Sequence, residues 1–136
     1  MKNIKFVFVI LIVFLFSGCS QTLTCTYNSD TENNIVKINF IDDKVAKINV
    51  EEVKTYDEND AYVEMFYYEQ LNKYNFLEDI DGVKYDIKEK KSTVTTKIEI
   101  DFTKIDNLDN KNIKVNNQTS SSDAKNIYGY LGYECK

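Results

Sequence analysis

The chain contains three cysteines, and their positions point to two different chemistries. Cys19 and Cys25 lie six residues apart near the amino terminus, whereas Cys135 is the second-last of 136 residues. A thiol at the cleavage point of an export signal can carry a lipid, and two thiols outside the cytoplasm can form a disulfide. The residues around each cysteine therefore decide which reaction it serves.

Residues 1–18 have the layout of a bacterial export signal. Lys2 and Lys5 precede an uninterrupted apolar run over residues 6–16, and two small residues follow it. A positively charged start, a short apolar stretch and small residues before the cleavage point are typical of such signals. The run is shorter than the roughly 20 residues that a membrane-spanning helix needs, so a permanent transmembrane helix is disfavoured.

Cys19 makes this segment resemble a bacterial lipobox, in which the cysteine receives diacylglycerol before the signal is removed. Phe16 stands where the consensus usually has an aliphatic residue. We expect residues 1–18 to be a lipoprotein signal peptide and the lipidated Cys19 to begin an extracytoplasmic domain, residues 19–136. Two acyl chains, at about 0.8 kcal/mol per buried CH₂, would anchor this domain durably. The alternative is ordinary cleavage, which leaves Cys19 free or in a disulfide.

Cys25 and Cys135 are expected to form a disulfide. Cys25 lies on the apolar face of the predicted first strand, and Cys135 follows a predicted helix that packs on the same sheet face. The two cysteines could therefore meet within the Cα separation of about 4.4 to 6.8 Å that a disulfide needs. Two free thiols and a redox or metal-binding pair are the alternatives, and an oxidising compartment favours the disulfide.

The composition limits the chemistry available to the rest of the chain. It has 17 Lys+Arg, all of them lysines, against 22 Asp+Glu, a net charge of −5, and no histidine. The chain thus lacks bidentate arginine clamps, and it lacks the commonest general base and nitrogen metal ligand. Its negative charge disfavours nucleic acid and anionic lipid headgroups as partners. We expect no cofactor, and any catalysis would depend on carboxylates, Lys, Tyr or Ser.

Hydrophobic periodicity predicts a single α+β domain. Alternation indicates a strand over 21–27, a hairpin over 35–53 that turns at Asp42 and Asp43, and a second hairpin over 83–102. Helical spacing indicates a main amphipathic helix between the hairpins and a short carboxyl-terminal helix. We therefore expect one antiparallel sheet of about five strands, in the order β-β-β-α-β-β-α, with both helices on one face.

The predicted main helix covers residues 61–74, with Asp57 and Asp60 as candidate caps. Its apolar stripe consists of Ala61, Met65, Tyr68 and Leu71, widened by Val63, Phe66, Tyr67 and Tyr74. The predicted short helix has Ser122 or Asp123 as its cap.

Residues 73–106 carry a resemblance to a known family. The matching residues are Lys73, Tyr74, Gly82 and Val83, then Ile100, Asp101, Lys104 and Asp106. They correspond to the "KY…GV" and "IDxxKxD" segments of the YehR-like family of small bacterial lipoproteins, which the chain resembles over most of its expected mature length. The resemblance implies a shared fold and an envelope location. Because the family has no established activity, it implies no catalytic residue, and Cys25 and Cys135 are not expected in it.

Aromatic residues are the main candidates for a binding surface. They are Tyr62, Phe66 and Tyr67 on the main helix and Tyr130 near the carboxyl terminus. A Tyr-rich face could contact a peptide, a glycan or a partner protein, and packing at the core and its rim is the alternative explanation.

The acidic clusters at 57–60, 78–81 and 106–112 lack the glycine and distal glutamate of a calcium loop. We therefore predict no metal site, with weak divalent-ion binding at 106–112 as the alternative. Residues 103–120, which include the last cluster, are polar and weakly patterned, so we expect mostly loop there.

The sequence predicts a lipid-anchored bacterial protein at the cell membrane, facing the extracytoplasmic side. We expect a non-catalytic binding or accessory module with an envelope protein, peptide or glycan as partner. The alternative is a cofactor-free envelope enzyme that uses paired carboxylates, for example on glycans. A deep cleft with convergent acids would favour the enzyme, and a shallow Tyr-rich surface would favour the binder.

Overall fold

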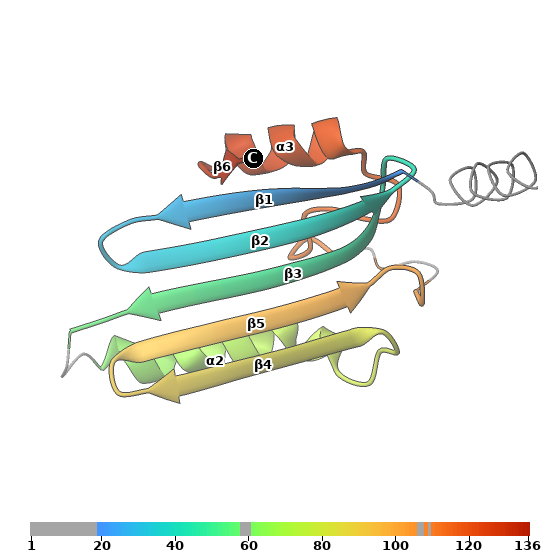
Figure 1. The fold of residues 1–136 in the computed structure, drawn as a ribbon. Helices are drawn as coiled ribbons and strands as arrows, with labels where there is room; N and C mark the ends of the chain where they lie inside the picture. The colour runs from blue at the N-terminus through green and yellow to red at the C-terminus, as the bar shows by residue number, and fades with distance from the viewer. Residues whose placement is uncertain (1–18, 58–60, 106–107, 109) are drawn as a thin grey trace, which may run out of the picture.

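The computed structural model describes residues 19–57, 61–105, 108 and 110–136. A single antiparallel sheet forms the centre of this part of the chain, with strand order β4-β5-β3-β2-β1-β6 (Figure 1). The strands are β1 (Ser20–Asn28), β2 (Glu32–Ile41), β3 (Lys44–Thr55), β4 (Val83–Lys90), β5 (Thr93–Asp101) and β6 (Glu134–Cys135). The helices are α2 (Tyr62–Tyr74), the 3₁₀ turn η1 (Asn75–Leu77) and α3 (Ser121–Tyr130). No helix in these residues is long and apolar enough to cross a membrane.

The predicted α+β class is confirmed, but the predicted strand count is wrong. The sheet has six strands in the described residues, because the chain end adds β6 to the outer edge of β1. β6 comprises two residues, which is too short for the alternation that marks a strand in a sequence. Backbone hydrogen bonds in both directions between Thr24 and Lys136, each 2.9 Å, complete its pairing with β1.

The turn between β2 and β3 lies where the acidic pair interrupts the apolar alternation. Asp42 and Asp43 both have positive φ, 52° and 57°. Two successive residues with positive φ give the turn that matches the twist of a hairpin, and aspartate tolerates this conformation better than most residues. The turn also contacts α3, because the Asp43 carboxylate accepts hydrogen bonds from the backbone N–H and the hydroxyl of Ser121, at 2.9 and 2.6 Å.

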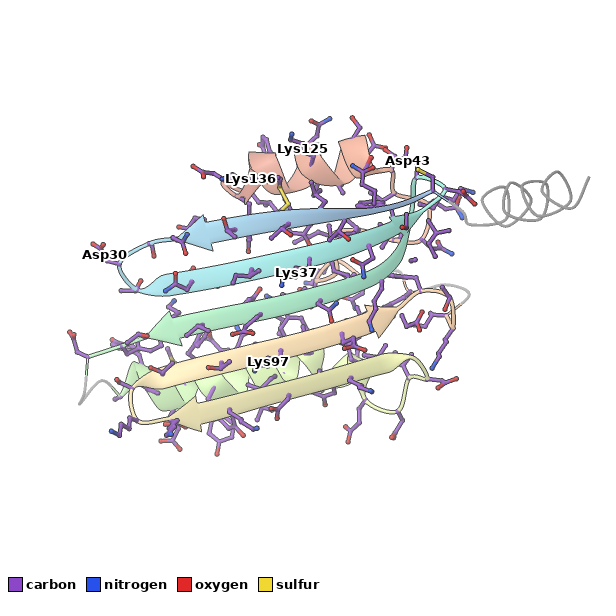
Figure 2. All side chains as sticks on the ribbon, in the orientation of Figure 1. Asp30, Lys37, Asp43, Lys97, Lys125 and Lys136 are labelled. Carbon is purple, nitrogen blue, oxygen red and sulfur yellow. A yellow bond between two sulfur atoms is a disulfide. The ribbon has the colours of Figure 1, made fainter. Side chains whose placement is uncertain are left out.

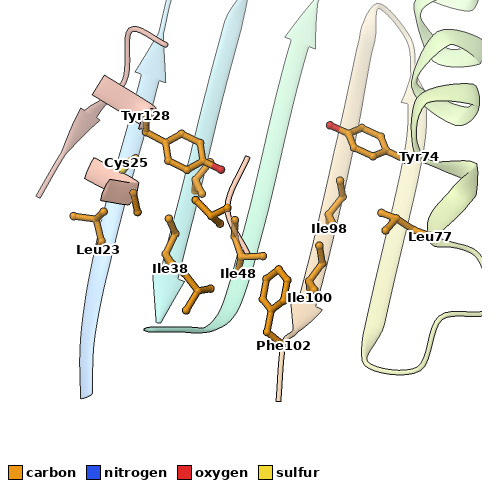
Figure 3. Close-up of a cluster of buried hydrophobic side chains, with 14 of the residues drawn as sticks. Leu23, Cys25, Ile38, Ile48, Tyr74, Leu77, Ile98, Ile100, Phe102 and Tyr128 are labelled. Carbon is orange, nitrogen blue, oxygen red and sulfur yellow. The ribbon is translucent and has the colours of Figure 1, made fainter. Parts of the chain in front are cut away.

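One face of the sheet carries the core, and both helices cover that face. Figure 3 shows Tyr74, from the end of α2, and Tyr128, from α3, pointing toward each other over the buried sheet residues. The largest fully buried side chains are Phe40, Ile38, Ile48, Leu77, Ile100, Val36, Val94, Thr96 and Cys25. The opposite face is polar and open, with Lys37 and Lys97 near its centre (Figure 2).

Helix α2 buries a narrower stripe than the sequence predicted. Met65 and Tyr68 are 50% and 55% exposed, whereas Val63, Gln70 and Tyr74 are buried. The predicted stripe was too wide because aromatic residues occur on several sides of this helix. Only one narrow side packs on the sheet, and it carries Val63, Gln70 and Tyr74, which follow one another at intervals of seven and four residues. The buried Gln70 is satisfied because its side-chain oxygen accepts a hydrogen bond from Thr96, at 3.4 Å.

The ends of both helices differ from the predicted caps. Ala61 precedes α2 and makes no side-chain cap, Asp57 lies upstream of it, and Asp60 is outside the described residues. Ser120 caps α3, accepting a hydrogen bond from the Asp123 N–H at 3.1 Å, so the prediction of Ser122 or Asp123 is wrong. In a run of three serines and an aspartate each residue can cap, and the preceding chain decides which one does.

Candidate functional site

Two hollows lie on the helix-covered face of the sheet, between α2 and α3, and are together called the Glu52 cleft. Their volumes are about 80 and 230 Å³, and Glu52 and Lys73 line both. The polar, charged and aromatic side chains that line the Glu52 cleft are Glu32, Asn34, Glu52, Lys54, Phe66, Gln70, Lys73, Tyr74, Thr96, Asn112, Lys114, Tyr128 and Tyr133. The aliphatic ones are Val36, Val50, Ile98, Ile113 and Leu131. Charged and aromatic groups that converge in a concave site are typical of small-ligand sites.

Glu52 points into this cleft because its place along β3 puts it on the same sheet face as Ile48 and Val50. Burial raises the pKa of its carboxyl above the usual range, and nearby Glu32 adds to the rise while Lys73 opposes it. Among the described residues, Glu52 has no ion pair within 4.0 Å and no side-chain hydrogen bond. Partial burial therefore makes the ionised carboxylate less favourable than it would be in water, and the charge of Lys73 offsets part of this cost.

The neighbouring charge Lys54 is held by other residues of the cleft. Its Nζ lies 3.4 Å from the Glu32 carboxylate and 4.7 Å from the centre of the Phe66 ring. Burial alone would lower the pKa of Lys54, but the interactions with Tyr56 and Glu32 outweigh it and raise the pKa. Glu32 and Lys54 thus neutralise each other, and the charges of Glu52 and Lys73 are left without such a pairing.

Three tyrosines surround Glu52. Burial, with the Glu52 carboxylate adding to it, raises the pKa of Tyr74 far above its usual range. Burial also raises the pKa of Tyr128 far above its usual range, and the charges of Tyr133 and Glu52 add to this rise. The pKa of Tyr133 is also raised, mainly by burial and then by Glu52, and its phenol makes a hydrogen bond with Asn34. These phenols therefore stay protonated and can donate hydrogen bonds into the cleft.

Lys73 reaches the cleft from the last turn of α2. Its Nζ lies 4.8 Å from the centre of the Tyr74 ring, and no carboxylate of a described residue lies within 4.0 Å of it. The backbone carbonyl of Lys73 accepts a hydrogen bond from the Asn112 side chain at 3.1 Å, which fastens the loop before α3 to α2. That loop closes one side of the cleft, and it is anchored by the buried Val115.

The predicted disulfide between Cys25 and Cys135 is present and fastens the other side of the cleft. The two residues lie directly opposite each other in the β1–β6 pair, with Cα atoms 4.0 Å apart, slightly below the expected range. Tyr133 packs against Tyr128 and Tyr27, with ring centres 5.2 and 5.7 Å apart. The bond thus pins the segment that carries two of the three tyrosines.

The residues predicted as a Tyr-rich surface are not brought together. Tyr62, Phe66 and Tyr67 lie on α2, which contacts β4 and β5, whereas Tyr130 lies on α3 beside β1, at the other side of the sheet (Figure 1). Tyr62 and Tyr130 are exposed, and Tyr67 is partly buried against Tyr68. Of the four, only Phe66 lines the cleft. The four predicted residues therefore do not form one surface, and Phe66 is the one that also belongs to the candidate cleft.

Cys19, the predicted lipidation site, is a free and exposed cysteine at the start of the sheet. Its carbonyl accepts a hydrogen bond from the Asp42 N–H at 3.1 Å, so the chain enters the sheet without a linker after this residue. Glu52 lies eight residues along β3 from the Lys44 end, about 26 Å at 3.3 Å per residue. Cys19 and the Glu52 cleft therefore lie toward opposite ends of the sheet.

The open face of the sheet holds a second hollow, of about 540 Å³. Its charged residues alternate across neighbouring strands, so that Lys97 lies opposite both Glu51 and Asp86. Opposite charges placed across neighbouring strands attract one another, and two carboxylates of this hollow also have a lysine 3.0 Å away, Glu99 from Lys47 and Asp86 from Lys88. The Glu52 cleft is the stronger candidate.

The acidic clusters make no cation site in the described part of the chain. No three His, Cys, Asp or Glu side chains come together there in an arrangement that could hold a metal ion. Residues 78–81 form the turn after η1, in which Asp79 has a φ of 62°. Much of the cluster at 57–60 and part of that at 106–112 lie outside the described residues.

The sequence contained one signal for the site that its periodicity did not reveal. In the β3 alternation, Glu52 falls at a position that continues the inward-facing series of Ile48 and Val50. A charge at an inward position breaks the pattern, and such breaks are expected at functional sites. Lys73 gave no comparable signal, since lysine near a helix end is common.

Comparison with known proteins supports the fold. No family model matches the chain, and no curated protein matches its sequence. The structure is similar to the NMR structure of the E. coli YehR protein, with a TM-score of 0.63 and 13% identity over 88% of this chain and 93% of that one. It is also similar to the NMR structure of a protein from Streptococcus pneumoniae TIGR4, with a TM-score of 0.50 and 14% identity over 87% and 86%. The chain therefore has a YehR-like fold.

Proposed function

We propose that the protein is a lipid-anchored extracytoplasmic binding module whose ligand site is the Glu52 cleft. The observation that carries this proposal is the partly buried Glu52 carboxylate, which lacks an ion-pair partner among the described residues and faces a cleft lined by tyrosines. A fold retains a destabilising charge of this kind where a ligand supplies the missing partner. The ligand is a small polar molecule, because the hollows measure about 80 and 230 Å³.

The position of Cys19 supports an anchored orientation. The lipid at Cys19 would hold one end of the sheet against the membrane, and the opposite end with the Glu52 cleft would face outward. Asp30 in the β1–β2 turn and Asp43 in the β2–β3 turn mark these outer and inner ends in Figure 2. The domain would have little reach, because the first strand begins at Ser20.

A second candidate is an envelope enzyme that uses paired carboxylates. The observation in its favour is that Glu32 and Glu52 line the same hollow, and that Glu32 raises the pKa of Glu52. Against it, Glu32 is engaged by Lys54, so only one carboxylate is free to act. An enzyme would leave a substrate trapped in a Glu52→Gln variant, whereas a binding module would lose its ligand.

The test is to identify what co-purifies with the protein. The full chain would be purified from membranes in mild detergent as the wild type, Glu52→Gln and Glu51→Gln, and extracted small molecules would be compared by mass spectrometry. Glu51 is the matched control because it is adjacent in β3 but lines the hollow on the open face. We expect one compound to be enriched with the wild type and Glu51→Gln and lost from Glu52→Gln. Equal recovery from all three proteins, or no compound, would contradict the proposal.

A further inference from the structure

We propose, building on the binding function above, that the ligand of the Glu52 cleft is a small zwitterion of the amino-acid type. Glu52 would receive its ammonium group and Lys73 its carboxylate. These are the two charged residues that line both hollows of the cleft, and they carry opposite charges. Among the described residues, neither Glu52 nor Lys73 forms an ion pair within 4.0 Å, with each other or with any other residue.

The surroundings of Glu52 suit an ammonium group. A carboxylate pairs with an ammonium through charge-assisted hydrogen bonds, which are stronger than those between neutral groups. The rings of Tyr74, Tyr128 and Tyr133 line the same hollow, and aromatic faces attract ammonium groups. Lys73 lies 4.8 Å from the Tyr74 ring centre, so the rings of Tyr128 and Tyr133 are the ones left for the ligand's ammonium group.

The nearby charge of Lys73 argues against a simple cation or a simple anion as the ligand. A ligand with only an amine would be attracted by Glu52 but repelled by Lys73. A ligand with only a carboxylate would be attracted by Lys73 but repelled by Glu52. The other cations around the cleft are already engaged: Lys54 by Glu32, at 3.4 Å, and Lys114 by the carbonyl of Lys111, at 3.0 Å. A ligand with one positive and one negative group gives both Glu52 and Lys73 a partner of opposite charge.

The sizes of the hollows suggest how such a ligand lies. The hollow of about 80 Å³ between the tyrosines has room for a charged head of a few atoms. The larger hollow of about 230 Å³ is lined by Phe66, Gln70 and Thr96, which can contact an apolar or mixed side chain. This arrangement favours amino acids with a side chain over glycine.

The test is a calorimetric titration of the purified full chain in detergent with the common L-amino acids. The best binder would then be compared with its amine, which lacks the carboxylate, and with its acid, which lacks the ammonium. We expect each half-ligand to bind at least about tenfold more weakly, because each loses one hydrogen-bonded charge pair. Equal binding of the amine or of the acid would overturn the zwitterion assignment.

Two variants with matched controls assign the groups. Glu52→Gln should weaken binding of the amino acid and its amine but strengthen binding of the acid, which Glu52 repels. Lys73→Gln should weaken binding of the amino acid and the acid but strengthen binding of the amine. The control variants Glu51→Gln and Lys97→Gln each remove one negative or one positive charge from the open face of the sheet. They should leave the affinities for the amino acid, its amine and its acid unchanged. If no amino acid binds while a co-purified compound still depends on Glu52, the zwitterion assignment fails and the binding function stands. If Glu52→Gln changes no binding at all, both fail.

Discussion

Cys135 lies directly opposite Cys25 across the β1–β6 pair, with their Cα atoms 4.0 Å apart. Tyr133, two residues earlier, lines the Glu52 cleft together with Tyr128. The disulfide therefore connects the stability of the domain to the shape of its candidate site. A short strand at a sheet edge would otherwise fray easily, because β6 comprises two residues.

Removing this disulfide is expected to cost both stability and binding. The bond closes a loop with a sequence separation of 110, so the double variant Cys25→Ala/Cys135→Ala should lose about 4 to 5 kcal/mol of unfolding free energy in the chain-entropy model. Urea unfolding followed by circular dichroism measures this loss. Reduction of the wild type serves as the control, because it breaks the bond without changing the packed volume at Cys25. An unchanged urea midpoint in both would contradict the structural role of the bond.

Glu52→Gln is expected to stabilise the protein at neutral pH. Burial raises the folded-state pKa of Glu52 above its ordinary value of 4.5, so the ionised carboxyl destabilises the fold above that raised pKa. This cost fades as the pH falls, and below 4.5 the carboxyl is protonated in both states. The melting temperature of the variant should therefore exceed that of the wild type at pH 7, and the difference should shrink toward pH 4. A variant less stable than the wild type at pH 7 would show that Glu52 has a structural partner.

Two glycines should respond in opposite directions to alanine. Gly82 has a φ of +83°, and a Cβ there would lie 2.9 Å from the Lys104 Cβ, so Gly82→Ala should cost more than about 1 kcal/mol. Gly129 lies within α3 with nothing within 4 Å of an added Cβ, so Gly129→Ala should stabilise by about 0.8 to 1.0 kcal/mol. Thermal unfolding of both variants and of the wild type measures the two changes in stability. Loss of stability in both would mean that the end of α3 is constrained by more than helix propensity.

Cys19→Ala tests the anchor. If Cys19 carries the lipid, the variant should be found either in the soluble extracytoplasmic fraction or as an unprocessed chain that keeps its signal. Fractionation of cells followed by mass measurement distinguishes these products. A membrane-bound variant of mature size would contradict lipid anchoring at this residue.

The sheet was largely predictable because alternation extends over most of each long strand. β1, β2 and β5 place their buried residues at every second position, and the acidic pair at Asp42 and Asp43 marks the turn after β2. The short strand β6 could not be predicted, because its pairing depends on the disulfide and on contacts with Thr24 that are distant in sequence.

The candidate site was less predictable than the fold. Aromatic residues on α2 drew attention to Tyr62 and Tyr67, but which of them faces the sheet depends on the rotation of the helix, and packing determines that. The cleft combines β2 and β3, the end of α2 and the chain end, and only tertiary structure brings Glu52 near Tyr128 and Tyr133.

The most direct test of the ligand site is NMR of the full chain in detergent micelles with isotope-labelled tyrosine rings, assigned by single Tyr→Phe variants. The ten tyrosines report on every candidate surface: Tyr74, Tyr128 and Tyr133 line the Glu52 cleft, Tyr85 lines the open-face hollow, and Tyr68 and Tyr130 are exposed on the helices. Addition of the compound recovered from the protein should shift the three cleft signals and leave the others in place. Shifts confined to Tyr85, or to Tyr68 and Tyr130, would contradict the assignment of the Glu52 cleft as the binding site.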